Sequence, residues 1–233
     1  YVQIMLDYFK DEIKGKTFAV SGFGNVAWGT IKKVNELGGK VVTISGPDGY
    51  IYDPDGISTD EKVDYLLEMR ASCRNRAEDY ADKFPSAKFF KGEKPWGVKA
   101  DLAFPCATQD EIYLEDAKKL VANGIKLVAE GANMPTRAEA IEYFQQNKVV
   151  FAPGKASNAG GVAVSGLEMS QNSERLSWSF EEVDRKLKDI MTNIHDNAWE
   201  TAKKYATEGD YVAGANIAGF LKVAEAMLAQ GLF

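Results

Sequence analysis

The chain has 233 residues, of which 45% are hydrophobic, so it can bury a full core as one large domain or as a domain with an appended helical part. Its 28 Lys and Arg residues against 34 Asp and Glu residues give a net charge of −6, and no stretch concentrates positive charge. Because nucleic acids and anionic membranes require such a concentration, we exclude both as partners and expect a small-molecule ligand at most.

Membrane spans and metal sites are not expected either. No apolar run approaches the roughly 18 residues that a bilayer span needs, and no cleavable leader opens the chain. Cys73 and Cys106 lack metal-ligand spacing and are predicted to be packing residues, and His195 is the single histidine. These features predict a cytoplasmic protein without a metal centre.

The first predicted helix comes from apolar residues at helical spacing: Val2, Met5, Leu6, Phe9 and Ile13. Tyr1 already lies inside this pattern, and no cap precedes it. We therefore expect the chain to be a piece of a longer protein.

Short strands and helices then alternate along the chain. Apolar and β-branched runs predict strands at residues 17–21, 40–45, 100–105, 125–130 and 149–152. Helical periodicity predicts helices at residues 26–37, 60–69, 116–123 and 138–146, with Ser58 and Thr136 as N-caps of the second and fourth. This order is typical of a Rossmann-like α/β fold, a doubly wound and mostly parallel sheet that binds ligands at the C-terminal ends of its strands.

No strand is predicted after residue 158. Three helices follow, at residues 162–169, from Ser179 onward with Glu182 completing a capping box, and at residues 215–229. We therefore divide the single predicted domain into an α/β core at 1–158 and a C-terminal helical segment at 159–233.

A glycine-rich loop is the strongest single motif. Gly22-Phe23-Gly24-Asn25-Val26-Ala27 lies between a predicted strand and a predicted helix. In this context the first glycine permits a tight turn, the second lets the backbone approach a pyrophosphate, and Ala27 allows close helix packing. The loop predicts dinucleotide binding, although glycines that merely form a turn would give the same letters.

The segment after the second strand bears on the choice of cofactor. An acidic residue that binds the ribose of NAD commonly lies here, where the chain has Ser45 and then Asp48 in a Pro-Asp-Gly turn. Asp48 serves either the ribose or only the turn, and both interpretations stay open. Because an extra phosphate beside Asp48 would be repelled by about 1–3 kcal/mol, we expect NAD, with NADP as the other candidate.

These motifs, taken together, resemble hexameric glutamate dehydrogenases of the Glu/Leu/Phe/Val dehydrogenase family. The matching segments are residues 22–27, 45–53, 105–109, 130–136, 157–165 and 168–172. The resemblance covers the entire chain and implies the C-terminal dinucleotide-binding domain of such an enzyme. It also implies that the substrate-binding N-terminal domain, with the catalytic lysine and aspartate, is absent, so that no catalytic residue is assigned and the piece alone is inactive.

The resemblance implies two groups of binding residues. Those of the cofactor are Gly22, Phe23, Gly24, Asn25 and Val26 at the pyrophosphate, Ser45 and Asp48, Ala107 and Thr108 beside the riboses, and Asn133 near the nicotinamide amide. Those of the substrate are Asn158, Val162 and Ser165, with the Ser165 hydroxyl on the side-chain carboxylate. From the residues alone, the favoured interpretation of Ser165 is a helix serine packed among small neighbours.

The implied function is an oxidoreductase of amino-acid metabolism and nitrogen assimilation. The complete enzyme would be a homohexamer that interconverts L-glutamate with 2-oxoglutarate and ammonia, using NAD or NADP. A related leucine, phenylalanine or valine dehydrogenase, or a free-standing NAD-binding regulatory module, are the alternatives.

Overall fold

The computed structural model describes residues 1–231 and divides them into two compact units. One unit is Phe9–Phe151, and the other combines Tyr1–Tyr8 with the residues from Ala152 onward. The first helix of the chain therefore belongs with the C-terminal helices, whereas the sequence alone placed it in the α/β core.

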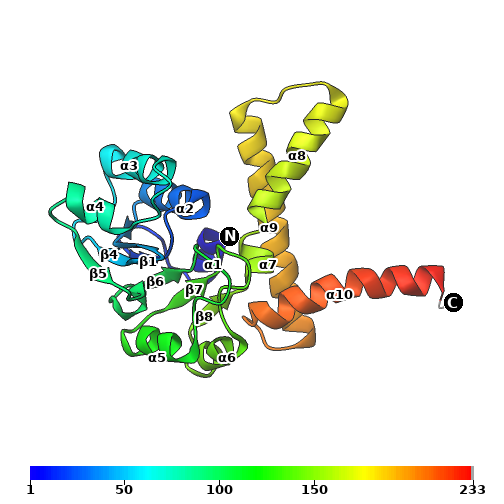
Figure 1. Ribbon diagram of the computed structural model, residues 1–233. Helices are drawn as coiled ribbons and strands as arrows, with labels where there is room; N and C mark the ends of the chain where they lie inside the picture. Colours follow the sequence, from blue (N-terminus) through cyan, green and yellow to red (C-terminus); the bar gives the residue numbers. More distant parts are fainter. Residues whose placement is uncertain (232–233) are drawn as a thin grey trace. The chain divides into compact units, whose positions relative to one another are not determined.

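A five-stranded parallel sheet forms the centre of the first unit (Figure 1). Its order is β2-β1-β6-β7-β8. The bounds are β1 Thr17–Val20, β2 Lys40–Val41, β6 Leu102–Phe104, β7 Leu127–Ala129 and β8 Val150–Ala152. β1 pairs in parallel with β2 on one side and with β6 on the other, so the chain changes direction across the sheet between them. The predicted Rossmann-like α/β class is confirmed, and the loops after β1 and β6 flank the switch point where such sheets bind ligands.

Amphipathic helices cover the sheet. These are α2 Asn25–Glu36, α3 Asp60–Ala71, α5 Leu114–Ala122 and α6 Ala138–Gln146. α2 contacts α3 on one side, and α5 contacts α6 on the other (Figure 1). α2 buries Ala27, Ile31 and Val34, which recur at helical spacing, while its charged residues are exposed.

A second, antiparallel sheet departs from the predicted pattern. The strand expected at residues 40–45 is split into β2 and β3 Thr43–Gly46, and β3 pairs with β4 Gly49–Tyr52, which pairs with β5 Lys88–Lys91. A short helix, α4 Glu78–Lys83, contacts β4, and a 3-10 turn covers Pro95–Gly97. The split occurs because the Val42 amide still bonds to Phe18 of β1, whereas the chain beyond it turns into a hairpin.

Two predicted helix caps are wrong: one was placed one residue too early, and the other residue makes no capping hydrogen bond. α3 is capped by Thr59, whose hydroxyl accepts the Lys62 amide, and not by Ser58. α6 has Arg137 at its N-cap without a side-chain cap bond, while the Thr136 amide donates to the buried carboxylate of Glu130. Tertiary contacts therefore replaced a local capping pattern.

The second unit is helical. It contains α1 Val2–Tyr8, α7 Gly154–Ser157, α8 Gly160–Glu174, α9 Phe180–Tyr205 and α10 Tyr211–Gln230. α1 is shorter than expected and ends before Phe9 and Ile13. The Ser179 cap of α9 is confirmed, since its hydroxyl accepts the Glu182 amide.

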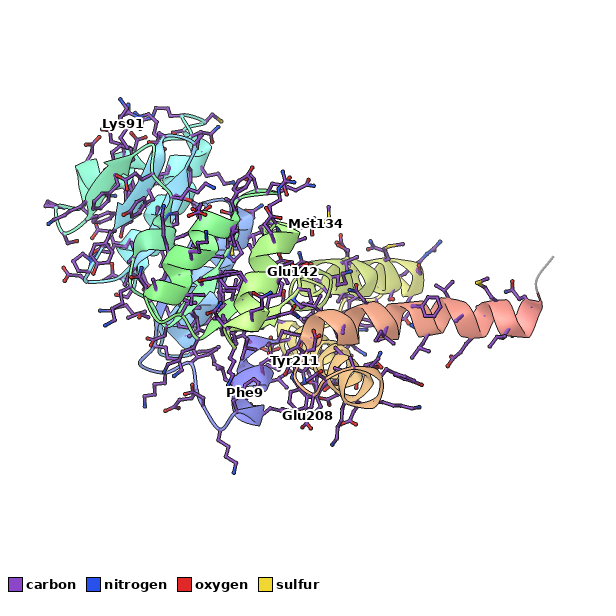
Figure 2. The ribbon with its side chains drawn as sticks, turned by 90° about the horizontal axis from the view of Figure 1, so that it is seen from below. Phe9, Lys91, Met134, Glu142, Glu208 and Tyr211 are labelled. Atoms are coloured by element: carbon purple, nitrogen blue, oxygen red, sulfur yellow. The ribbon has the colours of Figure 1, made fainter. Side chains whose placement is uncertain are left out.

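α10 contradicts the expectation that no apolar run could span a membrane. By length and composition this helix passes that test, with a mean hydropathy of 1.4 and 6% of its apolar window buried. Large apolar side chains of this helix are exposed from Phe220 onward, among them Leu228. Tyr211, at the start of the helix (Figure 2), is buried. A single such helix is weak evidence for a membrane span.

Candidate functional site

The two glycines of the loop after β1 have different reasons to lack a side chain. Gly22 has a φ of +79°, and a Cβ there would lie 3.1 Å from the Cα of Ala107. Gly24 has a φ of −75° at the start of α2, and a Cβ there would meet no atom within 4 Å. The fold therefore requires Gly22, whereas Gly24 leaves open space in front of the helix N-terminus, whose first amides lack intrahelical partners.

Three loops converge beside this helix N-terminus. A Cβ on Gly131, after β7, would lie 2.6 Å from the Sγ of Cys106, after β6, and 3.2 Å from Val26 of α2. Together these loops line a cavity of about 330 Å³. Its lining residues are Val26, Cys106, Ala107, Thr108, Gln109, Gly131, Ala132 and Asn133. The structure thus brings together four predicted cofactor residues, Val26, Ala107, Thr108 and Asn133.

Two other predicted cofactor residues do not offer their side chains to this cavity. Phe23 is 6% exposed, so its ring belongs to the core. The Asn25 side chain accepts a hydrogen bond from the guanidinium of Arg70 on α3, a residue that the sequence did not single out. Phe23 can therefore serve a phosphate only through the backbone of the loop, whereas Asn25 is exposed and its side-chain NH₂ group remains a donor.

The side chains of Ser45 and Asp48 form hydrogen bonds with other segments of the protein near the glycine loop. The Ser45 hydroxyl accepts the Gly22 amide at 3.0 Å and so fixes the glycine loop. The carboxylate of Asp48 accepts the amides of Ala77 at 2.8 Å and Glu78 at 3.1 Å, where α4 begins. The carboxylate of Asp48 therefore caps the start of α4, a role that neither interpretation of Asp48 included, and its contact with a ribose stays a prediction.

A carboxylate that the sequence analysis missed lies behind the cavity. Glu111 accepts the Ala107 amide at 3.1 Å, and Thr108 and Ser21 also donate to it. Burial raises the pKa of Glu111 to about 6, because the ionised form loses hydration that these hydrogen bonds only partly replace. Ala107 and Thr108 are local partners of Glu111, but Ser21 lies 90 positions away by the difference of the two residue numbers, and this contact becomes visible only in the folded protein.

The cysteines differ in their surroundings. Cys106 is buried as predicted, and burial raises the pKa of its thiol to about 12, so it is an inert wall of the cavity. Cys73 is exposed, with a φ of 56°, so its prediction as a packing residue is wrong. Among the described residues no group of His, Cys, Asp and Glu could hold a metal ion.

The predicted substrate residues lie on the helical unit. Asn158 is at the C-terminal end of α7, and Val162 and Ser165 are on α8. Val162 is 74% exposed, and the Ser165 hydroxyl donates to the Gly161 carbonyl of its own helix at 3.3 Å. A substrate role for these three residues stays a prediction.

The order of these loops and the residues that form them match one known family along almost the whole chain. The model of the Glutamate/Leucine/Phenylalanine/Valine dehydrogenase family matches residues 1–231. The chain belongs to this family. The predicted family resemblance is therefore confirmed.

Curated relatives within the Glutamate/Leucine/Phenylalanine/Valine dehydrogenase family are close in sequence. The chain is 60% identical over 233 residues to an NAD-specific glutamate dehydrogenase of Clostridium symbiosum, and 53% identical over 238 residues to an NADP-specific glutamate dehydrogenase of Haemophilus influenzae. Each alignment covers 100% of this chain and 52% of the relative. The chain therefore spans about half the length of the curated relatives it matches.

Solved structures of this family have the same fold. A glutamate dehydrogenase structure superimposes with a TM-score of 0.96 at 59% identity, covering 100% of this chain and 52% of that one. A Plasmodium falciparum glutamate dehydrogenase gives a TM-score of 0.95 at 47% identity, covering 100% and 50%. The family fold therefore extends through both the α/β unit and the helical unit.

Proposed function

We propose that this chain is the dinucleotide-binding part of a glutamate dehydrogenase, an oxidoreductase that interconverts L-glutamate with 2-oxoglutarate and ammonia. The cofactor is NAD, with NADP as the second candidate. The proposal includes a cytoplasmic location, which rests on the cysteine usage and the sequence pattern, and a homohexameric complete enzyme, which rests on the family resemblance.

One observation carries the binding part of this proposal. The open space at Gly24 lies at the N-terminus of α2, and a lined cavity begins beside it at Val26. If the glycines only formed a turn, the chain itself would need Gly22 but not Gly24. Helix N-termini attract anions because their amides and dipole present positive charge, so a pyrophosphate fits this position.

The residues present fit such a cofactor. The backbone of residues 24–26 would receive the pyrophosphate, and the loops at Ala107–Thr108 and Asn133 would extend along the riboses and the nicotinamide. When bound, the nicotinamide supplies a hydride acceptor for the substrate carbon that carries the amino group. The protein's own contribution is orientation and exclusion of water, and Ser165 is proposed to donate to the distal carboxylate of the substrate.

Glutamate is favoured over leucine, phenylalanine or valine within the family. Relatives that are 60% and 53% identical are named glutamate dehydrogenases. A hydroxyl such as that of Ser165 also suits a side-chain carboxylate better than an apolar side chain. The relatives' names include both NAD-specific and NADP-specific enzymes. The preference between the two cofactors is therefore decided by measuring both affinities.

The test is a calorimetric titration of the chain with NAD and, separately, with NADP at fixed salt concentration, for the wild type and for Gly24→Val. We expect the wild type to bind NAD more tightly and Gly24→Val to lose at least tenfold in affinity, about 1.4 kcal/mol, because the branched side chain fills the space of the phosphates. Gly29→Ala is the matched control, since position 29 is also open but lies further along α2.

Both outcomes are informative. Unchanged NAD affinity in Gly24→Val would place the cofactor elsewhere and overturn the site. Absence of binding by the wild type, followed by binding when the chain is produced with the missing half of its relatives' length, would show that the site is completed by other residues. A free-standing NAD-binding module would instead bind without any gain from such an extension.

A further inference from the structure

Glu111 connects to three consecutive amides of the loop that lines the cavity. It accepts the amides of Ala107 and Thr108 directly. It also accepts from the hydroxyl of Ser21, which in turn accepts the Cys106 amide at 2.9 Å. One carboxylate thus orients the backbone of residues 106–108, directly or through Ser21.

The same carboxylate is linked to the glycine loop. Ser21 directly precedes Gly22, and Gly22 packs against the Cα of Ala107. A change in the position of Glu111 would therefore reach both loops that flank the switch point of the sheet. Ionised acceptors form hydrogen bonds roughly twice as strong as neutral ones, so the charge of Glu111 matters to this arrangement.

Among the residues that the structure describes, no cationic side chain forms an ion pair with the carboxylate of Glu111. The Cys106 thiol stays neutral because its pKa is raised to about 12. Lys94 lowers the pKa of Glu111 through its charge, but its Nζ donates to the backbone carbonyl of Glu111 at 2.7 Å and pairs with Asp116 at 3.0 Å. On the preceding residue, Asp110 pairs with Arg137 at 3.0 Å. Hydrogen bonds from the loop are thus the main stabilisation of the ionised form.

We propose that Glu111 is a positioning residue that holds the Cys106–Thr108 loop in its binding conformation when ionised, so that dinucleotide affinity depends on its protonation state. This proposal rests on the proposed function, because it takes the cavity beside the loop as part of the dinucleotide site. No contact between Glu111 and the cofactor is needed, since the loop transmits the effect.

The sign of the pH dependence follows from the pKa. With a pKa raised to about 6, Glu111 is ionised above that pH and takes up a proton below it. Protonation removes the charge and turns one acceptor oxygen into a donor, so the loop loses part of its support. Affinity should fall as pH decreases, by about tenfold between pH 7.5 and 5 if the protonated form does not bind.

The experiment measures the Kd of NAD from pH 5 to 8 for the wild type, Glu111→Gln, Glu111→Asp and the control Glu115→Gln, an exposed glutamate at the start of α5. The wild type and Glu115→Gln should lose about tenfold in affinity over this range. Glu111→Gln should bind weakly with a flat profile, and Glu111→Asp should restore part of the pH dependence. A wild-type profile in Glu111→Gln would overturn the proposal.

A second measurement separates this proposal from the proposed function. In the free protein, amide resonances of Ala107 and Thr108 should shift with an inflection near pH 6, and Glu111→Gln should abolish that inflection. If the inflection occurs but no dinucleotide binds, the proposed function fails while the control of the loop by Glu111 stands. If dinucleotide binds but the amides do not titrate, the role of Glu111 is overturned alone.

Loss of folding would not explain the expected behaviour of Glu111→Gln. A pKa raised on folding means that the stabilising contribution of the protonated carboxyl is present below pH 4.5 and is lost as pH rises through 6. The neutral amide should therefore leave the unfolding free energy at pH 8 unchanged or raise it. Thermal unfolding at pH 8 checks this, and a large loss of stability there would indicate a purely structural role.

Discussion

At the scale of single residues, the shape of the cavity depends on how closely the backbones of neighbouring loops approach one another. Gly22 and Gly131 allow the loops after β1, β6 and β7 to come within van der Waals contact, and Glu111 then bonds to the amides that this contact aligns. A partly buried carboxylate that is ionised at neutral pH, as Glu111 is, is a cost to folding that a purely structural position would avoid. Such local conflicts with stability are typical of binding sites.

The first prediction at this scale is that Gly22→Ala destabilises the protein by about 1–2 kcal/mol, because an L-residue must adopt a positive φ there. The 3.1 Å approach to Ala107 should also displace the loop and weaken NAD binding. Gly29→Ala in the same region should instead stabilise α2 by about 0.5–1 kcal/mol. Denaturant unfolding measures both, and equal stability of the two variants would refute the role of Gly22.

At the scale of elements, the helical unit depends on one close crossing and one aromatic cluster. Gly214 of α10 packs onto α9 so closely that a Cβ would overlap the carbonyl of Ala198 and lie 3.1 Å from the Cβ of Ala202. Nearby, the buried His195 of α9 bonds to the Tyr211 hydroxyl of α10 at 2.9 Å and contacts Tyr8 of α1. Burial lowers the pKa of His195, so the neutral ring joins the three helices.

The prediction for this element pair is that Gly214→Ala destabilises the α9–α10 contact by about 1–3 kcal/mol, since the added methyl group has no space. Gly219→Ala in the same helix meets no atom within 4 Å and should be neutral or slightly stabilising. Thermal unfolding followed by the tyrosine and tryptophan signal compares the pair. A wild-type Tm for Gly214→Ala would show that the two helices can move apart without a loss of stability.

At the scale of the whole molecule, the chain forms two compact units and passes between them twice, after Tyr8 and after Phe151. The proposed cofactor residues belong to the unit Phe9–Phe151, and the proposed substrate residues belong to the helical unit. Binding of a dinucleotide should therefore act on one unit first.

Hydrogen exchange with and without NAD tests this division. At a concentration 100 times the Kd, amides in the strands β1, β6 and β7 should gain up to about 2.7 kcal/mol of protection, because the ligand stabilises only the folded unit that binds it. Amides of α9 and α10 should change much less. Equal protection of both units would show that they unfold together as one cooperative body.

The sequence by itself determined the fold class, most helices and strands of the sheet, the glycine loop and the family, because periodicity, turn residues and ordered motifs are local signals. It placed Val26, Ala107, Thr108 and Asn133 at the ends of strands, where the structure shows them around one cavity. It missed the antiparallel sheet, in which β3 and β4 form a local hairpin and β5 is recognised only by its pairing with β4, where Lys88 lies opposite Tyr52, 36 positions away by the difference of the two residue numbers.

Only the tertiary structure decided which side chains already form hydrogen bonds with other parts of the protein. Asp48 caps α4 from 29 positions away, Ser45 holds the Gly22 amide from 23 positions away, and Ser21 receives the Cys106 amide from 85 positions away. Hydrogen bonds of this kind depend on how parallel strands and their loops come together in space. No spacing within a single segment encodes them, which is why Arg70 and the contact of Glu111 with Ser21 became visible only in the folded protein.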